Sequence, residues 1–278
     1  MQVSSSNMIP IKKEHFEGID GTTVHWLGSA GVLINSNGTT ILIDPVLDEV
    51  EIDGEYWTRS GGLKLFQRVP IQLEKMPKVD AILYTHADED HIGYRSYQIL
   101  AGTGVKIYCP GYVKEVFRNN GVSVTNIEIV KSYSEFQIKD ITVTCTKAIH
   151  PWQEKLTGGH YVYQEEDCVG FMLHTKDGVI WHPGDTVLLD EHFHYPKIDL
   201  LLIDFSDDPY HFGTKQAIQL ANYYKEAKLM AIHWGTYESE KSAMNGNPYA
   251  VKASIEQQER LIITSIGRKF CLNMKGVI

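Results

Sequence analysis

The chain lacks the features that mark several common classes of protein. Its 278 residues include only four cysteines, and no two of them form a Cys-x-x-Cys pair, so neither a zinc ribbon nor a dithiol redox site is expected. No apolar run approaches the roughly 18 residues of a membrane span, and the N-terminus has no basic region followed by an apolar stretch. These absences predict a cytoplasmic protein with no membrane partner.

Positive charge is also scarce. Lys and Arg number 26 against 35 Asp and Glu, so the net charge is −9, the wrong sign for holding a polyanion by counterion release. No nucleic-acid partner is therefore expected, and a homo-oligomer is left open. Repeats, low-complexity tracts and Pro/Ser-rich linkers are absent as well, which favours a single domain over residues 1–278 with a polar lead at residues 1–20.

Apolar and β-branched runs predict strands in both halves of the chain. The expected strands cover residues 23–27, 32–35, 40–43, 79–84, 106–108, 126–130, 135–138, 141–146, 169–174, 179–181, 200–203 and 229–232, with helices from 91 toward 100 and over 112–119 and 215–227. Each half has strands first and strand–helix alternation later, which is typical of two sheets covered by helices. The predicted fold is an α/β (α+β) chain that forms a four-layer αββα sandwich.

Residues 46–76 show few periodic signals. They include a pair of glycines and several aromatic residues, so a long, irregular functional loop that lines the pocket is expected. Arg59 in this loop, and Arg95 one turn beyond His91, are candidates for contacting an anionic small-molecule substrate. Solvated surface charge is the alternative for both arginines.

Histidine is the residue that the chain has in excess, with twelve. Four clusters of ionisable residues stand just after predicted strands, where the strand fixes the backbone and the following loop aims side chains. They are His86-x-Asp88-x-Asp90-His91 after AILYT, His150 after ITVTCT, Asp185 after VIW and His233 after KLMAI. Imidazole and carboxylate groups together bind zinc, iron or manganese. A lone histidine is more often a structural residue, but four such clusters make coincidence a poor explanation.

These motifs resemble the metallo-β-lactamase fold hydrolases, whose signature is H-x-[HED]-x-D-H followed by a distant His, Asp and His. The resemblance covers roughly residues 22–240 and includes Asp44 in the segment LIDP. Within that superfamily, the segments WLGSAGVLI, ILYTHADEDH, WHPGDT and GTKQAIQLA resemble the branch of ascorbate-6-phosphate lactonase and its relatives.

The resemblance implies a binuclear site with two divalent metal ions, Zn, Mn or Fe. One ion would be held by His86, Asp88 and His150, the second by Asp90, His91 and His233, and Asp185 would bridge the two. The commonest family pattern has His in place of Asp88, and a carboxylate there shifts the preference from zinc toward iron or manganese. Flavodiiron proteins carry Glu at the matching position. It is left open that Asp88 is too short to bind.

Such a site predicts hydrolysis of a small ester, lactone or phosphodiester by a metal-bridging hydroxide. Asp90 is expected to orient the nucleophile as well as to bind metal. His211, in DDPYHFGT, is the candidate for a donor to the anionic intermediate or for a general acid, with a supporting or surface histidine as the alternative. Asp44 and Asp204 are expected to support metal ligands through hydrogen bonds, with strand-end caps as the alternative.

Two other functions remain open. The carboxylate at Asp88 motivates a di-iron redox protein of the flavodiiron site type, although the chain has no room for the flavin domain of those proteins. A metal-stabilised interaction module without activity would require a broken ligand set, and six of the seven positions match the commonest pattern. Among the other histidines, His182 is expected either to face the pocket or to be solvated, and His192 and His194 are expected in a solvated loop.

Overall fold

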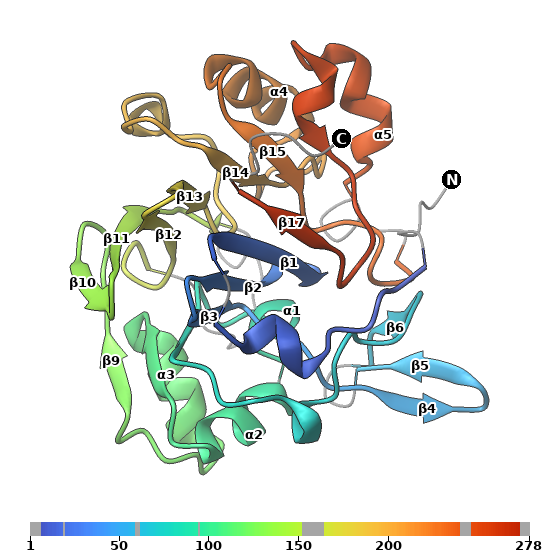
Figure 1. Cartoon of the computed structure of the whole chain (residues 1–278), viewed down its shortest axis with the longest axis vertical. Coiled ribbons are helices and arrows are strands. Elements are labelled where there is room, and N and C mark those ends of the chain that lie inside the picture. Colours follow the sequence, from blue (N-terminus) through green and yellow to red (C-terminus); the bar gives the residue numbers. More distant parts are fainter. Residues whose placement is uncertain are drawn as a thin grey trace.

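The computed structural model describes residues 7–18, 20–58, 62–93, 95–151, 164–239 and 246–272. Two seven-stranded sheets lie at the centre of the described chain, and helices cover their outer faces (Figure 1). The expected four-layer arrangement is confirmed. None of the helices in the described ranges is long and apolar enough to cross a membrane.

The first sheet contains strands from the first half of the chain and one from its end. In spatial order they are β17 (Lys269–Cys271), β1 (Thr22–Gly28), β2 (Gly31–Ser36), β3 (Thr39–Ile43), β7 (Ala81–Leu83), β8 (Lys106–Cys109) and β9 (Ile127–Ile129). The pairs from β17 to β3 are antiparallel, and those from β3 to β9 are parallel.

The second sheet repeats this change from antiparallel to parallel pairing. Its order is β10 (Glu135–Ile138), β11 (Ile141–Lys147), β12 (Val169–Thr175), β13 (Gly178–His182), β14 (Leu200–Ile203), β15 (Lys228–Ala231) and β16 (Leu261–Ile262). Pairing is antiparallel from β10 to β13 and parallel from β13 to β16. Because β11 is antiparallel to β12, and β12 to β13, the strands β11, β13, β14 and β15 all point in one direction.

The helices are short. They are α1 (Glu89–Ile92), α2 (Ser96–Gly102), α3 (Gly111–Asn119), α4 (Thr214–Tyr223) and α5 (Pro248–Val251), with 3₁₀ turns η1 (Lys13–Phe16), η2 (Leu73–Lys75), η4 (Asp190–Phe193), η6 (Lys252–Ser254) and η7 (Gln258–Arg260). Figure 1 shows α2 and α3 on one side of the sheets and α4 and α5 on the other. The helix expected over 215–227 ends at Tyr223, because the chain must turn before β15 starts at Lys228.

Side chains alternate between the two faces of the first sheet, as the two-residue period of a strand requires. Val32 and Ile34 of β2 belong to the core that this sheet shares with the second one. Leu33 joins a separate core with Val113 and Phe117 of α3. Both faces are thus buried, which explains why these strands read as nearly continuous apolar runs.

The expectation of an irregular loop at residues 46–76 is wrong. This segment contains a small antiparallel sheet of β4 (Val50–Ile52), β5 (Glu55–Trp57) and β6 (Lys64–Leu65). Asp53 and Gly54, which connect β4 and β5, have φ angles of 52° and 82°, the left-handed backbone of a tight hairpin turn. The pair Asp-Gly was the available sequence signal, but strands of two or three residues are too short to show alternation.

All the strands that precede the ionisable clusters end at the same edge of the sandwich. β3 and β7 run parallel in the first sheet, and β11, β13, β14 and β15 run in one direction in the second. The loops that follow them therefore meet across the two sheets. The fold brings together side chains that are more than 140 positions apart, such as His86 and His233.

Candidate metal centre

The loop after β7 presents the first cluster of ionisable side chains. Asp88 occupies the N-cap position of α1, where an aspartate usually accepts hydrogen bonds from the first helical N–H groups. Its side chain makes no such bond. The carboxylate instead turns away from the helix, toward His150.

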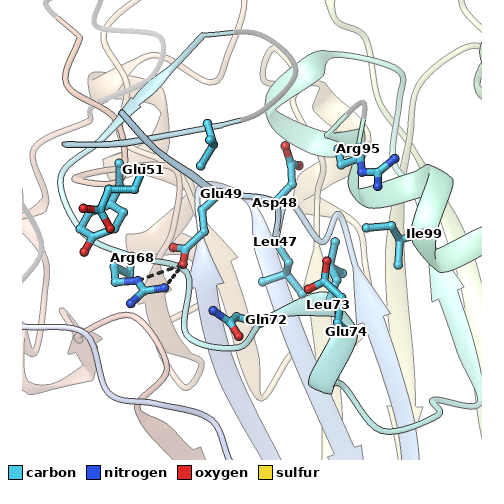
Figure 2. Close-up of a pocket in the computed structure, with 12 residues that line it drawn as sticks. Leu47, Asp48, Glu49, Glu51, Arg68, Gln72, Leu73, Glu74, Arg95 and Ile99 are labelled. Carbon is cyan, nitrogen blue, oxygen red and sulfur yellow. Dashed lines mark hydrogen bonds and ion pairs between the residues drawn. The ribbon is translucent and has the colours of Figure 1, made fainter. Parts of the chain in front are cut away.

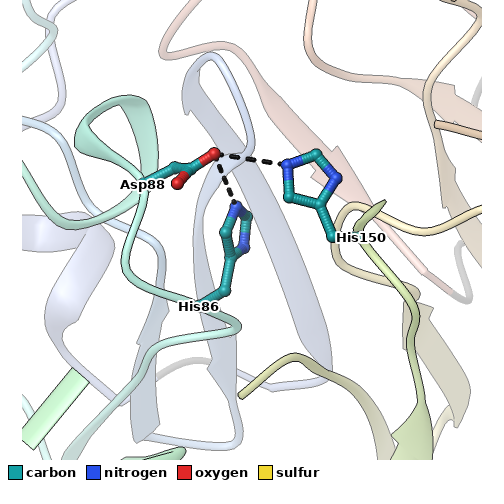
Figure 3. A group of neighbouring side chains, drawn as sticks. All are labelled: His86, Asp88 and His150. Carbon is teal, nitrogen blue, oxygen red and sulfur yellow. Dashed lines mark hydrogen bonds and ion pairs between the residues drawn. The ribbon is translucent and has the colours of Figure 1, made fainter. Parts of the chain in front are cut away.

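The first group consists of His86, Asp88 and His150, all pointing toward one another (Figure 3). Asp88 Oδ2 lies 3.6 Å from His86 Nε2 and 3.2 Å from His150 Nε2. The Nδ1–H of His150 donates to the Tyr210 carbonyl at 3.1 Å. The Thr85 hydroxyl donates a hydrogen bond to Asp44 Oδ2 at 2.6 Å. Its oxygen therefore accepts the Nδ1–H of His86, at 3.0 Å. Both rings therefore present the Nε2 lone pair to the group.

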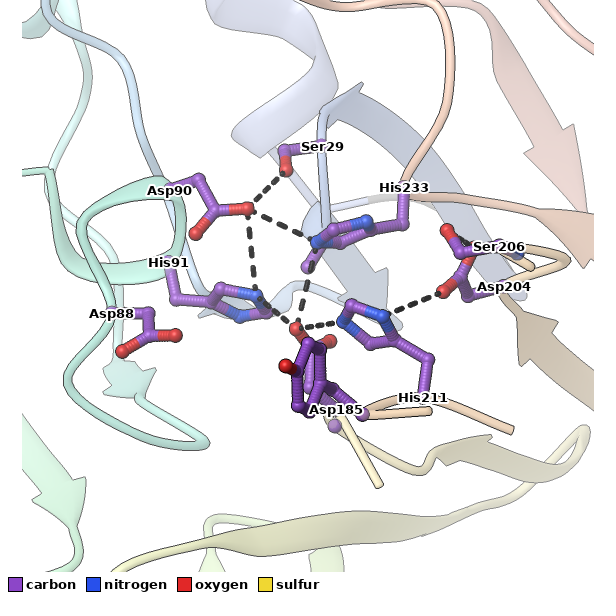
Figure 4. Close-up of polar contacts among 12 residues, drawn as sticks. Ser29, Asp88, Asp90, His91, Asp185, Asp204, Ser206, His211 and His233 are labelled. Atoms are coloured by element: carbon purple, nitrogen blue, oxygen red, sulfur yellow. Dashed lines mark hydrogen bonds and ion pairs between the residues drawn. The ribbon is translucent and has the colours of Figure 1, made fainter. Parts of the chain in front are cut away.

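The second group consists of Asp90, His91 and His233 (Figure 4). Asp90 Oδ2 lies 3.1 Å from His233 Nε2 and 3.9 Å from His91 Nε2. The Nδ1–H of His91 donates to Asp44 Oδ2 at 2.9 Å, and Asp44 itself accepts the Thr85 backbone N–H at 2.8 Å and the Thr85 hydroxyl at 2.6 Å. The buried Asp44 thus fixes the orientation of the His91 ring.

One oxygen of Asp185 lies between the two groups. Asp185 Oδ2 is 3.9 Å from His86 Nε2, 3.1 Å from His91 Nε2 and 3.6 Å from His233 Nε2. The Gly184 that precedes it has a φ of 67° and leaves no space for a Cβ, which would lie 2.8 Å from the Val169 carbonyl oxygen. The turn that delivers Asp185 therefore depends on glycine at position 184.

The spacing of these atoms suits a divalent cation. Two ligands that are each about 2.1 Å from a metal ion lie about 3.0 to 3.4 Å from each other at octahedral or tetrahedral angles. The separations of 3.1 to 3.9 Å within the groups are close to this range. Ligand atoms in each group lie within 4.8 Å of one another. The donor set, imidazole nitrogens and carboxylate oxygens, is the one that zinc, iron and manganese prefer.

The pKa shifts of these buried groups also favour a bound cation. Burial by itself raises the pKa of Asp185, but the positive charges of His91, His211 and His233 hold this pKa well below its usual range. Burial lowers the pKa of His91, yet Asp185 and Asp90 raise it well above its ordinary value. The buried carboxylates are thus stabilised by positive charge on the histidines. A bound cation supplies the same charge and can replace those protons.

His211 lies beside the cluster, between two carboxylates. Its Nε2 is 2.8 Å from Asp185 Oδ2, and its Nδ1–H donates to Asp208 Oδ2 at 2.8 Å. Asp208, three residues before His211, was missed in the sequence. Asp204 is the acid expected to support a ligand. Its Oδ1 accepts hydrogen bonds from the backbone N–H and hydroxyl of Ser206, and its Oδ2 lies 3.9 Å from His211 Nδ1. The direct partner of His211 is therefore Asp208.

Two further histidines, His182 and His192, have structural roles. His182 is buried, donates from Nε2 to the Ala30 carbonyl at 2.8 Å and accepts the Gly184 N–H, so it does not face a pocket. His192 is fully buried, with Nε2 bonded to the Lys147 carbonyl, so its expected solvation is wrong. His194 is exposed, as expected.

A cavity of about 440 Å³ lies between the β4–β5 hairpin and α2 (Figure 2). Segment 46–76 supplies most of its wall, Arg95 lies at one side, and Arg68 in it is bound to Glu49. No residue of the two metal-binding groups lines this cavity. Arg59 lies outside the described residues.

A second hollow, of about 460 Å³, touches the cluster. It is lined by His211 and Asp208 together with the apolar side chains of Val187, Leu188 and Phe212. The hollow lies on the side of His211, and its lining contains no residue of the two metal-binding groups themselves.

Comparison with known proteins identifies relatives of this chain. Residues 39–234 match the family model described as a beta-lactamase superfamily domain. The N-acyl-phosphatidylethanolamine-hydrolyzing phospholipase D 1 of Caenorhabditis elegans is 25% identical over 250 residues, which cover 82% of this chain and 67% of that protein. A UPF0173 metal-dependent hydrolase of Koribacter versatilis is 25% identical over 244 residues, 86% of this chain and 93% of the relative.

The fold is also found among solved structures. A protein of Veillonella parvula, described as a possible metal-dependent hydrolase, has a TM-score of 0.71 at 18% identity, over 91% of this chain and 100% of that one. The lactonase-like branch stays a prediction. Since the family model matches well over half of the chain, this protein belongs to the beta-lactamase superfamily and has the metallo-β-lactamase fold.

Proposed function

We propose that this protein is a hydrolase that uses two divalent metal ions, held by the His/Asp cluster, to cleave a small ester, lactone or phosphodiester. The broader class, metal-dependent hydrolase, follows from the superfamily and from the names of the C. elegans and K. versatilis relatives. The observation that supports a binuclear site is the position of Asp185. Its Oδ2 lies 3.9 Å from His86 Nε2 in the first group and 3.1 Å from His91 Nε2 in the second, so this one carboxylate would be within reach of both proposed sites.

The proposed ligands divide into two sets. His86, Asp88 and His150 hold one ion, Asp90, His91 and His233 hold the other, and Asp185 lies between them. When bound, two divalent ions polarise the group under attack and lower the pKa of nearby water. Asp90 accepts a hydrogen bond from the attacking water and so orients it.

His211 acts on the substrate side of the cluster. Both of its ring nitrogens face carboxylate oxygens, which accept hydrogen bonds, so the ring is held as a donor. From this position it can donate to the oxygen that gains negative charge during the reaction. The hollow beside it, with Val187, Leu188 and Phe212 in its wall, is the proposed place for the group attached to that oxygen.

The name of the C. elegans relative states hydrolysis of N-acyl-phosphatidylethanolamine, which is a phosphodiester. We therefore place phosphodiesters first among the three substrate classes.

The test begins with protein that has been stripped of metal by a chelator and reloaded with Mn²⁺, with Zn²⁺, or with Fe²⁺ under anaerobic conditions. Bound metal is measured by mass spectrometry. Bis(p-nitrophenyl) phosphate, p-nitrophenyl acetate and a simple γ-lactone serve as probes.

We expect two equivalents of metal and turnover of at least one probe. His150→Ala and His233→Ala should each remove about one equivalent of metal and abolish turnover. Fully loaded protein that hydrolyses none of the three probes would contradict the proposed activity. Unchanged metal content in both alanine variants would contradict the proposed ligand sets.

A di-iron redox protein is the second candidate, and Asp88 is the residue that favours it. A carboxylate 3.2 Å from His150 Nε2 adds an oxygen ligand to the first group, and oxygen-rich sets favour iron over zinc. An absorption band that develops when Fe²⁺-loaded protein meets oxygen, together with no hydrolysis of any probe, would favour this candidate over the hydrolase.

A further inference from the structure

The loop between β14 and α4 holds His211 where the two metal-binding groups meet. The ring centroid of His211 is 5.4 Å from that of His150 in the first group and 5.1 Å from that of His233 in the second. Its Nε2 is 2.8 Å from the shared oxygen of Asp185. The side chain is almost completely buried, so its orientation is decided by its neighbours.

Asp208 contacts His211 through both of its oxygens. Oδ2 accepts the Nδ1–H of the ring at 2.8 Å, and Oδ1 accepts the backbone N–H of His211 at 3.2 Å and that of Tyr210 at 2.8 Å. A single carboxylate thus fixes both the backbone turn and the imidazole ring. The Tyr210 carbonyl in the same turn accepts the Nδ1–H of His150. The turn therefore helps to orient one histidine of the metal-binding groups as well.

The neighbouring acid cannot take over this contact. Asp204 Oδ2 is 3.9 Å from His211 Nδ1, beyond hydrogen-bonding distance. Its Oδ1 is occupied by the N–H and hydroxyl of Ser206. Of the two acids in this loop, Asp208 is therefore the one bonded to Nδ1 of the ring.

We propose that Asp208 is a positioning residue for hydrolysis, which holds His211 so that its Nε2 edge faces the place between the two metal-binding groups where the substrate reacts. This inference rests on the proposed function. The Asp208 side chain bonds to the ring and backbone of His211 and to the Tyr210 N–H, and to no proposed metal ligand, so its effect on the reaction passes through this turn and the position of the His211 ring.

The first test uses Asp208→Asn. The asparagine Oδ1 can still accept the Tyr210 N–H and keep the turn, but the amide NH₂ is a donor and cannot accept the Nδ1–H of His211. With bis(p-nitrophenyl) phosphate and Mn²⁺-loaded protein, we expect kcat to fall about tenfold or more, while KM and bound metal stay within about twofold of wild type. The matched control is Asp190→Asn, which makes the same change of side chain at an exposed acid outside the hollow and should leave both constants unchanged.

The second test asks whether Asp208 acts through His211. In a His211→Ala background, Asp208→Asn should cause no further loss, because residues that act as a unit are not additive. The same loss of kcat in both backgrounds would overturn the proposal, as would a fall in bound metal that accounts for the lost turnover.

The third test does not depend on turnover. Long-range ¹H–¹⁵N correlation spectra of Zn²⁺-loaded, histidine-labelled protein should show a protonated Nδ1 for His211 in the wild type and in Asp190→Asn. In Asp208→Asn that signal should move or disappear. An unchanged Nδ1–H signal would overturn the proposal. If wild-type protein hydrolyses no probe, the proposed function fails, but the spectra still decide whether Asp208 sets the ring.

Discussion

Asp88 differs from the histidine that the commonest pattern of the superfamily has at this position. Its carboxylate makes no capping bond to α1 and faces His150 at 3.2 Å, so a substitution removes a proposed ligand atom without uncapping the helix. We predict that Asp88→His raises the ratio of bound Zn²⁺ to bound Mn²⁺ about tenfold, because imidazole favours zinc and carboxylate favours manganese. Competitive loading with equal amounts of both ions, followed by mass spectrometry, measures the ratio.

The matched control for Asp88→His is Asp207→His. It makes the same change of side chain and charge at an exposed position outside the cluster, and its metal ratio should equal that of the wild type. A ratio in Asp88→His that stays within twofold of the wild type would show that residue 88 does not contribute to metal choice.

His25, on β1, is a buried histidine that packs away from solvent. Burial is the main cause that lowers its pKa to about 4 from an ordinary value of 6.5, although the bond from Nδ1 to the Gly267 carbonyl opposes this. Between these two values the unfolded chain binds a proton that the folded chain does not, so stability must fall as the pH drops from about 6.5 to about 4. Above pH 6.5 the residue contributes no pH dependence.

We predict that His25→Gln, which keeps a donor for the Gly267 carbonyl, loses less stability than the wild type between pH 7 and pH 4.5. The difference should reach about 2 to 3 kcal/mol. Urea unfolding of chelator-treated protein at a series of pH values measures it. His194→Gln, at an exposed position, is the control and should follow the wild-type curve. Parallel curves for His25→Gln and wild type would refute the prediction.

At the scale of elements, Arg260 joins the C-terminal segment to α4. The side chain is only 3% exposed, and its guanidinium donates to the carbonyls of Ala221, Tyr224, Ala227 and Glu256. These include carbonyls at the end of α4, which have no partner within the helix. The fork of the guanidinium can satisfy several such acceptors at once.

We predict that Arg260→Met lowers the free energy of unfolding by about 3 kcal/mol or more, because it leaves buried carbonyls without donors. Arg260→Lys should recover only part of this loss, since an ammonium group cannot reproduce the planar fork. Denaturant unfolding measures both. Arg268→Met, at an exposed arginine, should change the value by less than about 0.5 kcal/mol. An equally small effect of Arg260→Met would contradict the role of this side chain.

The long strands could be predicted from the sequence because their burial leaves a strong apolar pattern. β14 was predicted with its observed bounds, Leu200–Ile203. The three-residue strand β7 was predicted because its apolar run extends over residues 79–84, whereas β16 and β17 have no run of this length and pair with strands that are distant in sequence. The lack of such a run also explains why the hairpin at β4 and β5 was missed.

At the scale of the whole molecule, the candidate ligands could be predicted because each of them follows a strand. What the sequence could not show is which side chain contacts which. Asp208 and Asp204 both precede His211 in one loop, and only the folded turn shows that Asp208 makes the bond. The order of the strands could not be predicted from the sequence either, because β17 joins the first sheet beside β1 from the far end of the chain.

The metal-binding groups also connect the two sheets. His86, Asp88, Asp90 and His91 follow β7 of the first sheet, whereas His150, Asp185 and His233 follow β11, β13 and β15 of the second. Each proposed ion would therefore have ligands from both sheets, and its removal should weaken their association.

Binding at a thousandfold excess over Kd stabilises a folded protein by about 4 kcal/mol per site, which corresponds to roughly 10 °C in Tm for a chain of this size. We predict that EDTA lowers Tm by at least that amount, that Mn²⁺ or Zn²⁺ restores it, and that Asp185→Asn shows a smaller shift. Calorimetry with and without chelator measures the change, and equal Tm values would show that metal does not join the sheets.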